Sequence, residues 1–224
     1  MSGFLWGALP YIAFTVMIVG TLYRYSTGER GWTSKSSEFL DKGGMKFAVP
    51  IFHLGLLMAF GGHVIGVLIP KAITDGVGIS EHVYHIIALA GGIPAGILFF
   101  GGFFLLLQRR YNNPRMKVNT STSDNLIYTL LFITIVTGFA GTLLNAVGLL
   151  GEGFNYRESI SPWFRSILAM NPDISLMADV PIIFKCHMLC WMLTAIAFPF
   201  TRLVHCLSFP FVYFTRANII YRRR

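Results

Sequence analysis

The sequence predicts an all-α membrane protein with five transmembrane helices. Hydrophobic residues make up 54% of the chain and charged residues only 12%, about half the charged share of a soluble domain. The apolar residues also fall in uninterrupted blocks of about 20 or more, the length that a helix needs to cross the hydrocarbon core of a bilayer. The expected spans are Phe4–Leu22, Phe47–Ile69, Val83–Leu107, Leu126–Leu150 and Ile182–Leu207.

Local signals support each span in turn. No charged n-region or small-residue cleavage site accompanies Phe4–Leu22, so we expect a retained helix rather than a signal peptide. Pro70 follows the second span, Glu81 opens the third, and Asp124 offers an N-cap for the fourth. Pro199 lies inside the fifth span and predicts a bend there.

Basic residues give the topology, because they mark the cytoplasmic side of a membrane protein. Only Lys71, Arg157 and Arg165 are expected in the loops after the second and fourth spans. The other loops and the tail carry many more: Arg24, Arg30, Lys35, Lys42, Lys46, Arg109, Arg110, Arg115, Lys117, Arg216 and Arg222–Arg224. The N-terminus is therefore expected outside and the C-terminus in the cytoplasm. This distribution assigns the net charge of +8 to topology and lipid headgroups rather than to nucleic acid.

Residues 1–224 are expected to form a single domain, because the chain has no internal repeat, low-complexity tract or linker. The longest connection, Gly151–Val180, has two possible structures. It forms either a short interfacial helix, with Trp163 and Phe164 at headgroup depth, or an irregular loop.

Four histidines, His53, His63, His187 and His205, fall inside the second and fifth predicted spans, where ionisable residues are costly and usually mark function. The second and fifth spans run in opposite directions, so His63 and His187 share the outer depth, and His53 and His205 the inner depth. Neutral imidazole is a good ligand for haem iron, and helical bundles commonly build such sites from facing helices. Two bis-histidine b haems are the expected cofactors, because no C-x-x-C-H motif for covalent c-type haem is present. The alternative for each histidine is a packing residue that is hydrogen-bonded between helices.

Helix geometry supports these pairs in part. In a continuous helix, the 18 residues from His187 to His205 make five full turns, which puts both on one face. His53 and His63 differ by about 80° around their helix. The distances along the helix axis agree less well. The rise from His53 to His63 is about 15 Å, whereas the rise from His187 to His205 would be about 27 Å.

Other polar residues are candidates for supporting roles. Arg202, Arg109 and Arg110 are expected at the inner face, where they could pair with haem propionates or simply reach the interface. His82 and His85 share one side of the third span at the outer face. They could accept protons from a quinol, or be interfacial histidines without chemistry.

Several motifs resemble the gamma (cytochrome b) subunit of respiratory nitrate reductase along nearly the whole chain. The matching features are Tyr23-Arg24 with Trp32, F-H-L-G-L-L at 52–57, G-G-H at 61–63, Arg109-Arg110, Phe184-Lys185-Cys186-His187, P-F-T-R-L-V-H at 199–205, Pro210 and the basic tail.

The resemblance implies a five-helix anchor in a prokaryotic cytoplasmic membrane, with two b haems. His63 and His187 would hold the outer haem, His53 and His205 the inner one, and Gly62 would line a quinol pocket. Electrons from the quinol would pass to an iron–sulfur beta subunit and then to a molybdenum alpha subunit that reduces nitrate. Better-known members carry a lysine at the start of the third helix; here Val83 falls at about that position.

Two other functions stay open at this point. A related dihaem anchor of another reductase, such as the sulfite reductase-associated type, would keep the haem ligands and change the partner. A histidine-lined transporter is the alternative from another class, although transporters usually show repeat symmetry around a midplane site. A purely structural anchor would leave four intramembrane histidines without a role.

Overall fold

The computed structural model describes residues 1–28, 32, 34, 37, 40, 44–149 and 154–207. Several basic residues that were used to predict the topology lie outside this part of the chain. They are Arg30, Lys35, Lys42, Arg216 and Arg222–Arg224.

Five helices in the described part of the chain are long and apolar enough to cross a membrane, which confirms the predicted spans. The first joins a π-helical turn, η1 (Phe4–Ala8), to α1 (Leu9–Gly28), and the second joins α2 (Met45–His63) to the π-helical turn η3 (Val64–Leu68). The others are α4 (Glu81–Asn112), α6 (Thr122–Ala146) and α8 (Ile182–Ala197), which continues into the 3-10 turn η5 (Phe198–Phe200). The shorter elements are α3 (Lys71–Gly76), α5 (Pro114–Val118), α7 (Ile160–Leu168), η4 (Ile174–Met177) and η6 (Arg202–Leu207).

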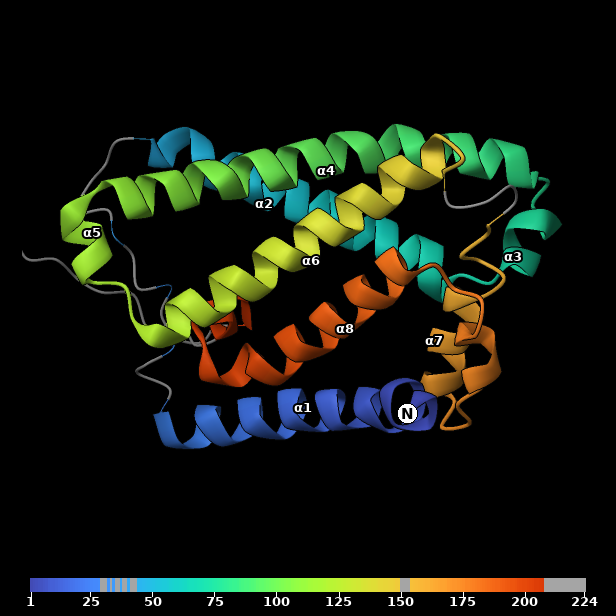
Figure 1. Ribbon diagram of the computed structural model, residues 1–224, viewed down its shortest axis with the longest axis horizontal. Helices are drawn as coiled ribbons and strands as arrows, with labels where there is room; N and C mark the ends of the chain where they lie inside the picture. The colour runs from blue at the N-terminus through green and yellow to red at the C-terminus, as the bar shows by residue number, and fades with distance from the viewer. Residues whose placement is uncertain are drawn as a thin grey trace, which may run out of the picture.

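The long helices form one bundle (Figure 1). α2 packs on α4, α4 on α6, α6 on α8, and α8 on α1. The N-terminus, α3 and α7 lie at one end of the bundle, and α5 lies at the other. We refer to these as the α7 end and the α5 end. α2 and α8, which carry three of the four candidate histidines, thus pack on different neighbours and face each other across the bundle.

Two glycines let α2 and α4 cross at close range. A Cβ atom built on Gly55 would stand 2.3 Å from the backbone nitrogen of Phe99, and one on Gly102 would stand 2.4 Å from the backbone nitrogen of Phe52. No side chain fits at either position without moving the facing backbone. These glycines therefore set the distance between the two helices, as small residues commonly do in membrane proteins.

The start of α6 differs from the prediction. Ser121, not Asp124, is the N-cap: its hydroxyl accepts a hydrogen bond from the Asp124 N–H, while the Asp124 carboxylate accepts one from the Ser121 N–H. This capping box moves the helix start upstream to Thr122. At the other end, α6 stops at Ala146, before the predicted Leu150. Val147 is the C-cap, and Gly148 after it has a left-handed conformation (φ 73°).

The fifth span ends earlier than predicted. α8 stops at Ala197, the turn Phe198–Phe200 contains Pro199, and Thr201 is extended (φ −121°, ψ −179°). The bend expected at Pro199 is confirmed, but the chain does not continue as one helix to Leu207. The assumption of five helical turns between His187 and His205 is therefore wrong, and the rise of about 27 Å that it implied does not apply.

The long connection between α6 and α8 contains a true helix, α7, that packs into the bundle. Trp163 is fully buried, and its Nε1 donates a hydrogen bond to the Trp6 carbonyl at 2.9 Å. The two indole rings meet edge to face at 5.8 Å. Trp163 thus belongs to the core between α1, α7 and α8, since a helix with one strongly apolar side buries that side.

Candidate functional site

Two of the predicted ligands face each other across the bundle. His63 is the last residue of α2, and His187 lies in the second turn of α8. Their ring centroids are 5.9 Å apart and the ring planes differ by 27°.

All four histidines that were predicted as haem ligands bond to a backbone carbonyl through Nδ1. His53 bonds to Val49 and His63 to Ala59, each one turn upstream in α2. His187 reaches across to the Thr134 carbonyl on α6, and His205 bonds to the Arg202 carbonyl. A carbonyl oxygen only accepts, so Nδ1 carries the proton in each ring and Nε2 keeps its lone pair. This is the tautomer in which imidazole binds a metal through Nε2, with the Nδ1–H fixing the ring.

The His63–His187 pair also suits haem iron in its spacing. Imidazole nitrogens bind metals at about 2 Å, so two rings on opposite sides of one iron have centroids about 6 Å apart. The observed 5.9 Å agrees with this value. The donor set, the tautomers and the spacing therefore fit a bis-histidine haem at this point of the bundle.

Gly138 on α6 makes room for the His187 ring. A Cβ built on Gly138 would stand 2.7 Å from Cε1 of His187 and 3.0 Å from its Nδ1. The Thr137 hydroxyl lies 3.3 Å from the same Nδ1. One turn of α6 thus sets both the position and the hydrogen bond of the His187 ring.

Replacing Gly138 with valine is expected to push the His187 ring off the Thr134 carbonyl. Overpacking of this kind costs about 1–3 kcal/mol, and its first effect would fall on the ring orientation. Metal affinity should fall about 10-fold or more, as for other changes around a metal-binding histidine. Haem content of the purified subunit measures this effect. Gly92→Ala is the control, because its Cβ meets only the Thr142 methyl group at 3.7 Å; equal haem loss in both variants would contradict the assignment.

The predicted inner ligands lie on separate elements. His53 is on α2, with its ring edge-on to Phe52 at 5.2 Å. His205 is on η6, beyond the break that follows α8. Their pairing on one haem stays a prediction.

The three arginines that were predicted to bind propionates have defined partners at the α5 end. Arg202 forms a two-pronged ion pair with Asp124 of α6, with contacts of 2.8 and 2.6 Å. Arg110 is buried and donates to the Thr120 hydroxyl, and Arg109 donates to the hydroxyl and carbonyl of Ser37. The Asp124–Arg202 pair was not predicted, because its members are 78 residues apart in the sequence.

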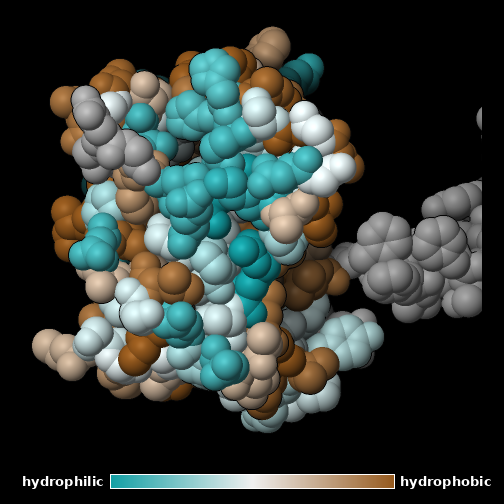
Figure 2. All heavy atoms as spheres, turned by 90° about the vertical axis from the view of Figure 1, so that its right-hand side faces the viewer, coloured by the Kyte–Doolittle hydropathy of each residue, from teal (hydrophilic) through white to brown (hydrophobic). Residues whose placement is uncertain are grey.

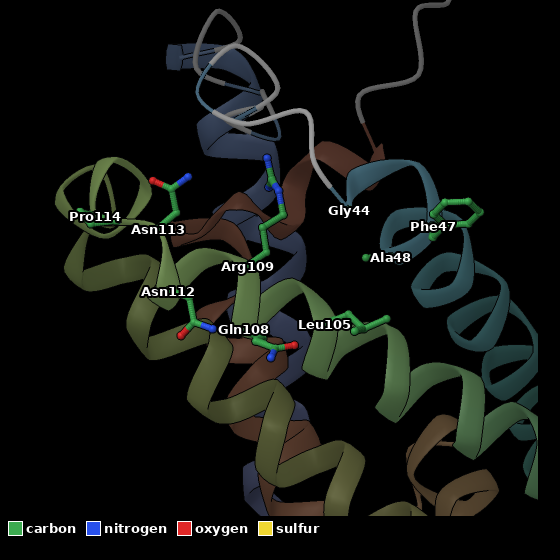
Figure 3. Close-up of a pocket in the computed structure, with 9 residues that line it drawn as sticks. All are labelled: Gly44, Phe47, Ala48, Leu105, Gln108, Arg109, Asn112, Asn113 and Pro114. Carbon is green, nitrogen blue, oxygen red and sulfur yellow. The ribbon is translucent and has the colours of Figure 1, made fainter.

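A pocket opens beside Arg109 where α2 begins and α4 ends (Figure 3). Its volume is about 620 Å³. Apolar side chains line the α2 side and amides the α4 side: Gly44, Phe47, Ala48, Leu105, Gln108, Arg109, Asn112, Asn113 and Pro114.

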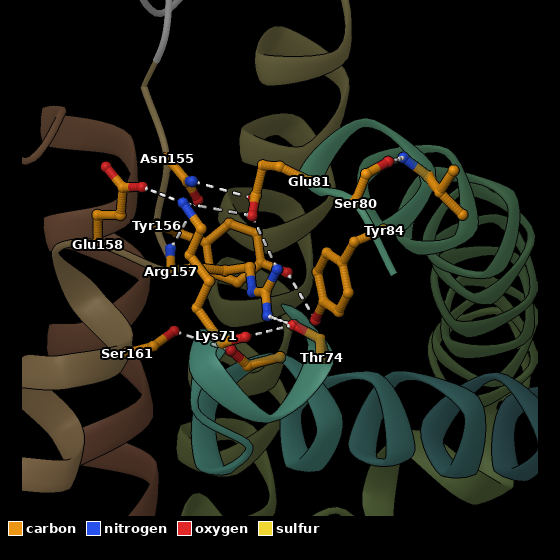
Figure 4. Close-up of polar contacts among 12 residues, drawn as sticks. Lys71, Thr74, Ser80, Glu81, Tyr84, Asn155, Tyr156, Arg157, Glu158 and Ser161 are labelled. Carbon is orange, nitrogen blue, oxygen red and sulfur yellow. Dashed lines mark hydrogen bonds and ion pairs between the residues drawn. The ribbon is translucent and has the colours of Figure 1, made fainter. Parts of the chain in front are cut away.

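A polar network covers the α7 end, where hydrophilic side chains gather on the surface (Figure 2, Figure 4). The buried Arg157 is at its centre: it forms an ion pair with Glu81 at 3.0 Å, donates to the Thr74 hydroxyl at 2.6 Å and stacks on Tyr84 at 3.6 Å. Lys71 pairs with Glu158 at 2.6 Å. Arg157 was predicted only as a topology signal, because its partners lie far from it in the sequence, on α3 and α4.

Arg157→Met should destabilise the α7 end by about 1–3 kcal/mol, because Thr74 and Glu81 lose their buried donor. Lys71→Met is the matched control, since an exposed ion pair contributes about 0–1 kcal/mol. The midpoint of thermal unfolding in detergent compares the two. A larger shift for Lys71→Met would show that the network is centred elsewhere.

α7 also holds the turn that follows His63. The Ser161 hydroxyl donates to the Gly66 carbonyl at 2.8 Å, and Arg165 donates to the Val67 carbonyl at 2.8 Å. Both carbonyls lie in η3, at a helix end where backbone acceptors lack partners of their own. The helix end that carries His63 is therefore fixed by α7. His82 and His85 lie nearby in the first turns of α4, with exposed side chains.

Comparisons with known proteins identify the family. The model of the nitrate reductase gamma subunit family matches residues 2–224. The nitrate reductase gamma chain of Bacillus subtilis (strain 168) is 45% identical over 225 residues, covering 100% of both chains. The respiratory nitrate reductase 1 gamma chain of Escherichia coli (strain K12) is 33% identical, over 100% of this chain and 98% of the relative. The nitrate reductase-like protein NarX of Mycobacterium tuberculosis (strain ATCC 25618 / H37Rv) is 38% identical, and this chain covers 34% of its length. The chain therefore belongs to the nitrate reductase gamma subunit family, and is a membrane subunit of an oxidoreductase complex whose catalysis takes place on other subunits.

Proposed function

We propose that this subunit oxidises a quinol near the outer face of the membrane and passes the electrons through two b haems to a cytoplasmic iron–sulfur subunit. His63 and His187 would hold the outer haem, and His53 and His205 the inner one. Each haem, when bound, supplies a one-electron carrier at a fixed depth in the membrane. The molybdenum-containing subunit would then reduce nitrate.

The observation that carries this proposal is the outer pair of imidazoles. The His63 and His187 rings stand 5.9 Å apart, with both Nδ1 atoms bonded to carbonyls. The match of the family model over residues 2–224 favours a nitrate reductase partner over a sulfite reductase or a transport function.

Quinol protons would be taken up at the α7 end, which we assign to the outer face. His82 and His85 are exposed there, and neutral imidazole accepts protons near neutral pH. Gly62, next to His63, is also exposed, and no atom lies within 4 Å of the place where its Cβ would stand. A quinol ring could approach the backbone at this glycine.

Lys71 is a poor candidate for the proton acceptor. The hydrogen bond with the Glu158 carboxylate raises the pKa of the Lys71 ammonium group above its usual value. Because its pKa is raised, the ammonium group stays protonated at neutral pH and loses its proton only at higher pH. Lys71 is therefore already charged when a quinol proton has to be accepted.

The α5 end would face the cytoplasm and the partner subunits. Basic residues that mark the inner side of a membrane lie in α5 and the last turn of α4: Arg109, Arg110, Arg115 and Lys117. Arg109 and Arg110 are the better candidates for propionate partners, because Arg202 already binds a carboxylate of its own chain. Electrons that move inward while protons stay outside would store about 2.3 kcal/mol per charge and 100 mV.

Membranes that contain the assembled complex test this function. Under anaerobic conditions, a menaquinol analogue should reduce b-type haem, and nitrate added afterwards should reoxidise it. The haem absorbance would be followed in the α-band. Haem that no quinol reduces, or that nitrate does not reoxidise, would exclude this electron path.

A further inference from the structure

His205 needs a support that α8 does not supply. α8 ends at Ala197, Thr201 is extended, and His205 lies in the short turn η6. A short 3-10 turn that follows the end of a helix has few hydrogen bonds of its own. The position of this proposed haem ligand must therefore depend on contacts with other helices.

One support comes from α1. Arg24 donates hydrogen bonds to the carbonyls of Pro199 and Thr201, at 2.7 and 2.8 Å. These carbonyls lie on both sides of the extended residue, so Arg24 fixes the place where the chain leaves α8. A second contact acts on η6 itself.

The second contact is the ion pair between Arg202 and Asp124. Asp124 has 1% of its side chain exposed and Arg202 has 12%. The carboxylate accepts from both Nε and Nη2 of the guanidinium, which is the geometry that fixes an arginine most firmly. Asp124 is itself fixed, because it belongs to the capping box of α6.

Arg202 connects this ion pair to the haem ligand through its own backbone. The Nδ1–H of His205 donates to the Arg202 carbonyl. A shift of Arg202 would therefore move the acceptor that sets the ring orientation and the tautomer of His205. The start of α6 and the turn η6 lie together at the α5 end of the bundle (Figure 1).

We infer that Asp124 is a positioning residue for the inner haem ligand His205, acting through the side chain and carbonyl of Arg202. This inference rests on the proposed function, which assigns His205 to a haem. Asp124 itself touches neither the haem nor a substrate.

The test uses the assembled complex with Asp124→Asn and with Arg202→Lys. The lysine keeps the positive charge but cannot donate two hydrogen bonds to the carboxylate as the guanidinium group does. Haem content and the electron paramagnetic resonance signal of each haem are measured. Asp124→Asn should lower the inner-haem content about 10-fold, while the outer haem keeps its wild-type content and signal. Arg202→Lys should shift the inner-haem signal alone. Glu81→Gln is the matched control: it removes the carboxylate of the other buried arginine pair, at the α7 end, and should leave the inner haem unchanged.

His205→Ala separates this inference from the proposed function. If His205→Ala removes no haem, the proposed ligand pairing fails and the inference fails with it. If His205→Ala removes one haem but neither Asp124→Asn nor Arg202→Lys alters that signal, the positioning role alone is overturned. If Asp124→Asn loses both haems because the subunit does not fold, Arg202→Lys decides, and a wild-type inner signal overturns the inference.

Discussion

Replacing His187 with alanine is expected to remove one of two haems and to lower quinol-driven nitrate reduction by more than about 100-fold. Changes around a metal-binding histidine alone cost about 10–100-fold in affinity or activity, so loss of the ligand itself should cost more. Nitrate reduction by a soluble reductant that reaches the catalytic subunits directly should stay near the wild-type rate. Haem content per chain and the two activities in membranes measure this prediction.

Cys186→Ser provides the matched control for His187→Ala. Cys186 is the neighbouring residue on α8 and is a free, half-buried thiol. We expect this variant to keep both haems and both activities. The account would be contradicted if His187→Ala kept two haems, or if it lost the quinol-driven and the soluble-reductant activity equally.

Gly102→Val is expected to prevent α2 and α4 from packing and to remove both haems. The new Cβ would stand 2.4 Å from the backbone nitrogen of Phe52, and the obstacle is backbone, which cannot rotate away as a side chain can. Overpacking usually costs about 1–3 kcal/mol and occasionally more; a clash with backbone should fall at the upper end. Both haems depend on this packing because α2 carries His53 and His63. Haem content and thermal unfolding in detergent report the loss.

Gly101→Val separates close packing from the general effect of a larger side chain. Gly101 is the neighbouring residue on α4, and no atom lies within 4 Å of the place where its Cβ would stand. The Gly101 variant should fold and retain haem close to wild-type levels. A comparable loss in both variants would mean that Gly102 does not set the distance between α2 and α4.

The sequence predicted those features that follow from local composition. Hydrophobic blocks of sufficient length locate helices in any membrane protein, and all five spans were found in this way. The ends of helices were less predictable, because they depend on particular hydrogen bonds. At the start of α6, Ser121 and Asp124 bond to each other, so the capping role expected of Asp124 alone is shared between two residues.

Contacts between distant residues explain what the sequence did not predict. Arg24 stabilises the segment that follows α8 by binding the carbonyls of Pro199 and Thr201. It lies 175 and 177 residues before them in the sequence. Pro199 indicated a bend, but nothing near it in the sequence indicated that His205 would lie on a separate turn. For the same reason, Arg157 was predicted only as a topology signal and Arg202 as a candidate propionate partner. Their ion pairs with Glu81 and Asp124 became visible only in the fold.

The most direct test of the haem proposal is a dithionite-reduced minus oxidised spectrum of the purified subunit, with haem quantified per chain. The account predicts b-type spectra with two haems per chain in the wild type. It also predicts one haem in His63→Ala, where the partner of His187 is lost. A subunit that carries no haem, or one whose haem content does not change in His63→Ala, would contradict the assignment of the facing imidazoles as haem ligands.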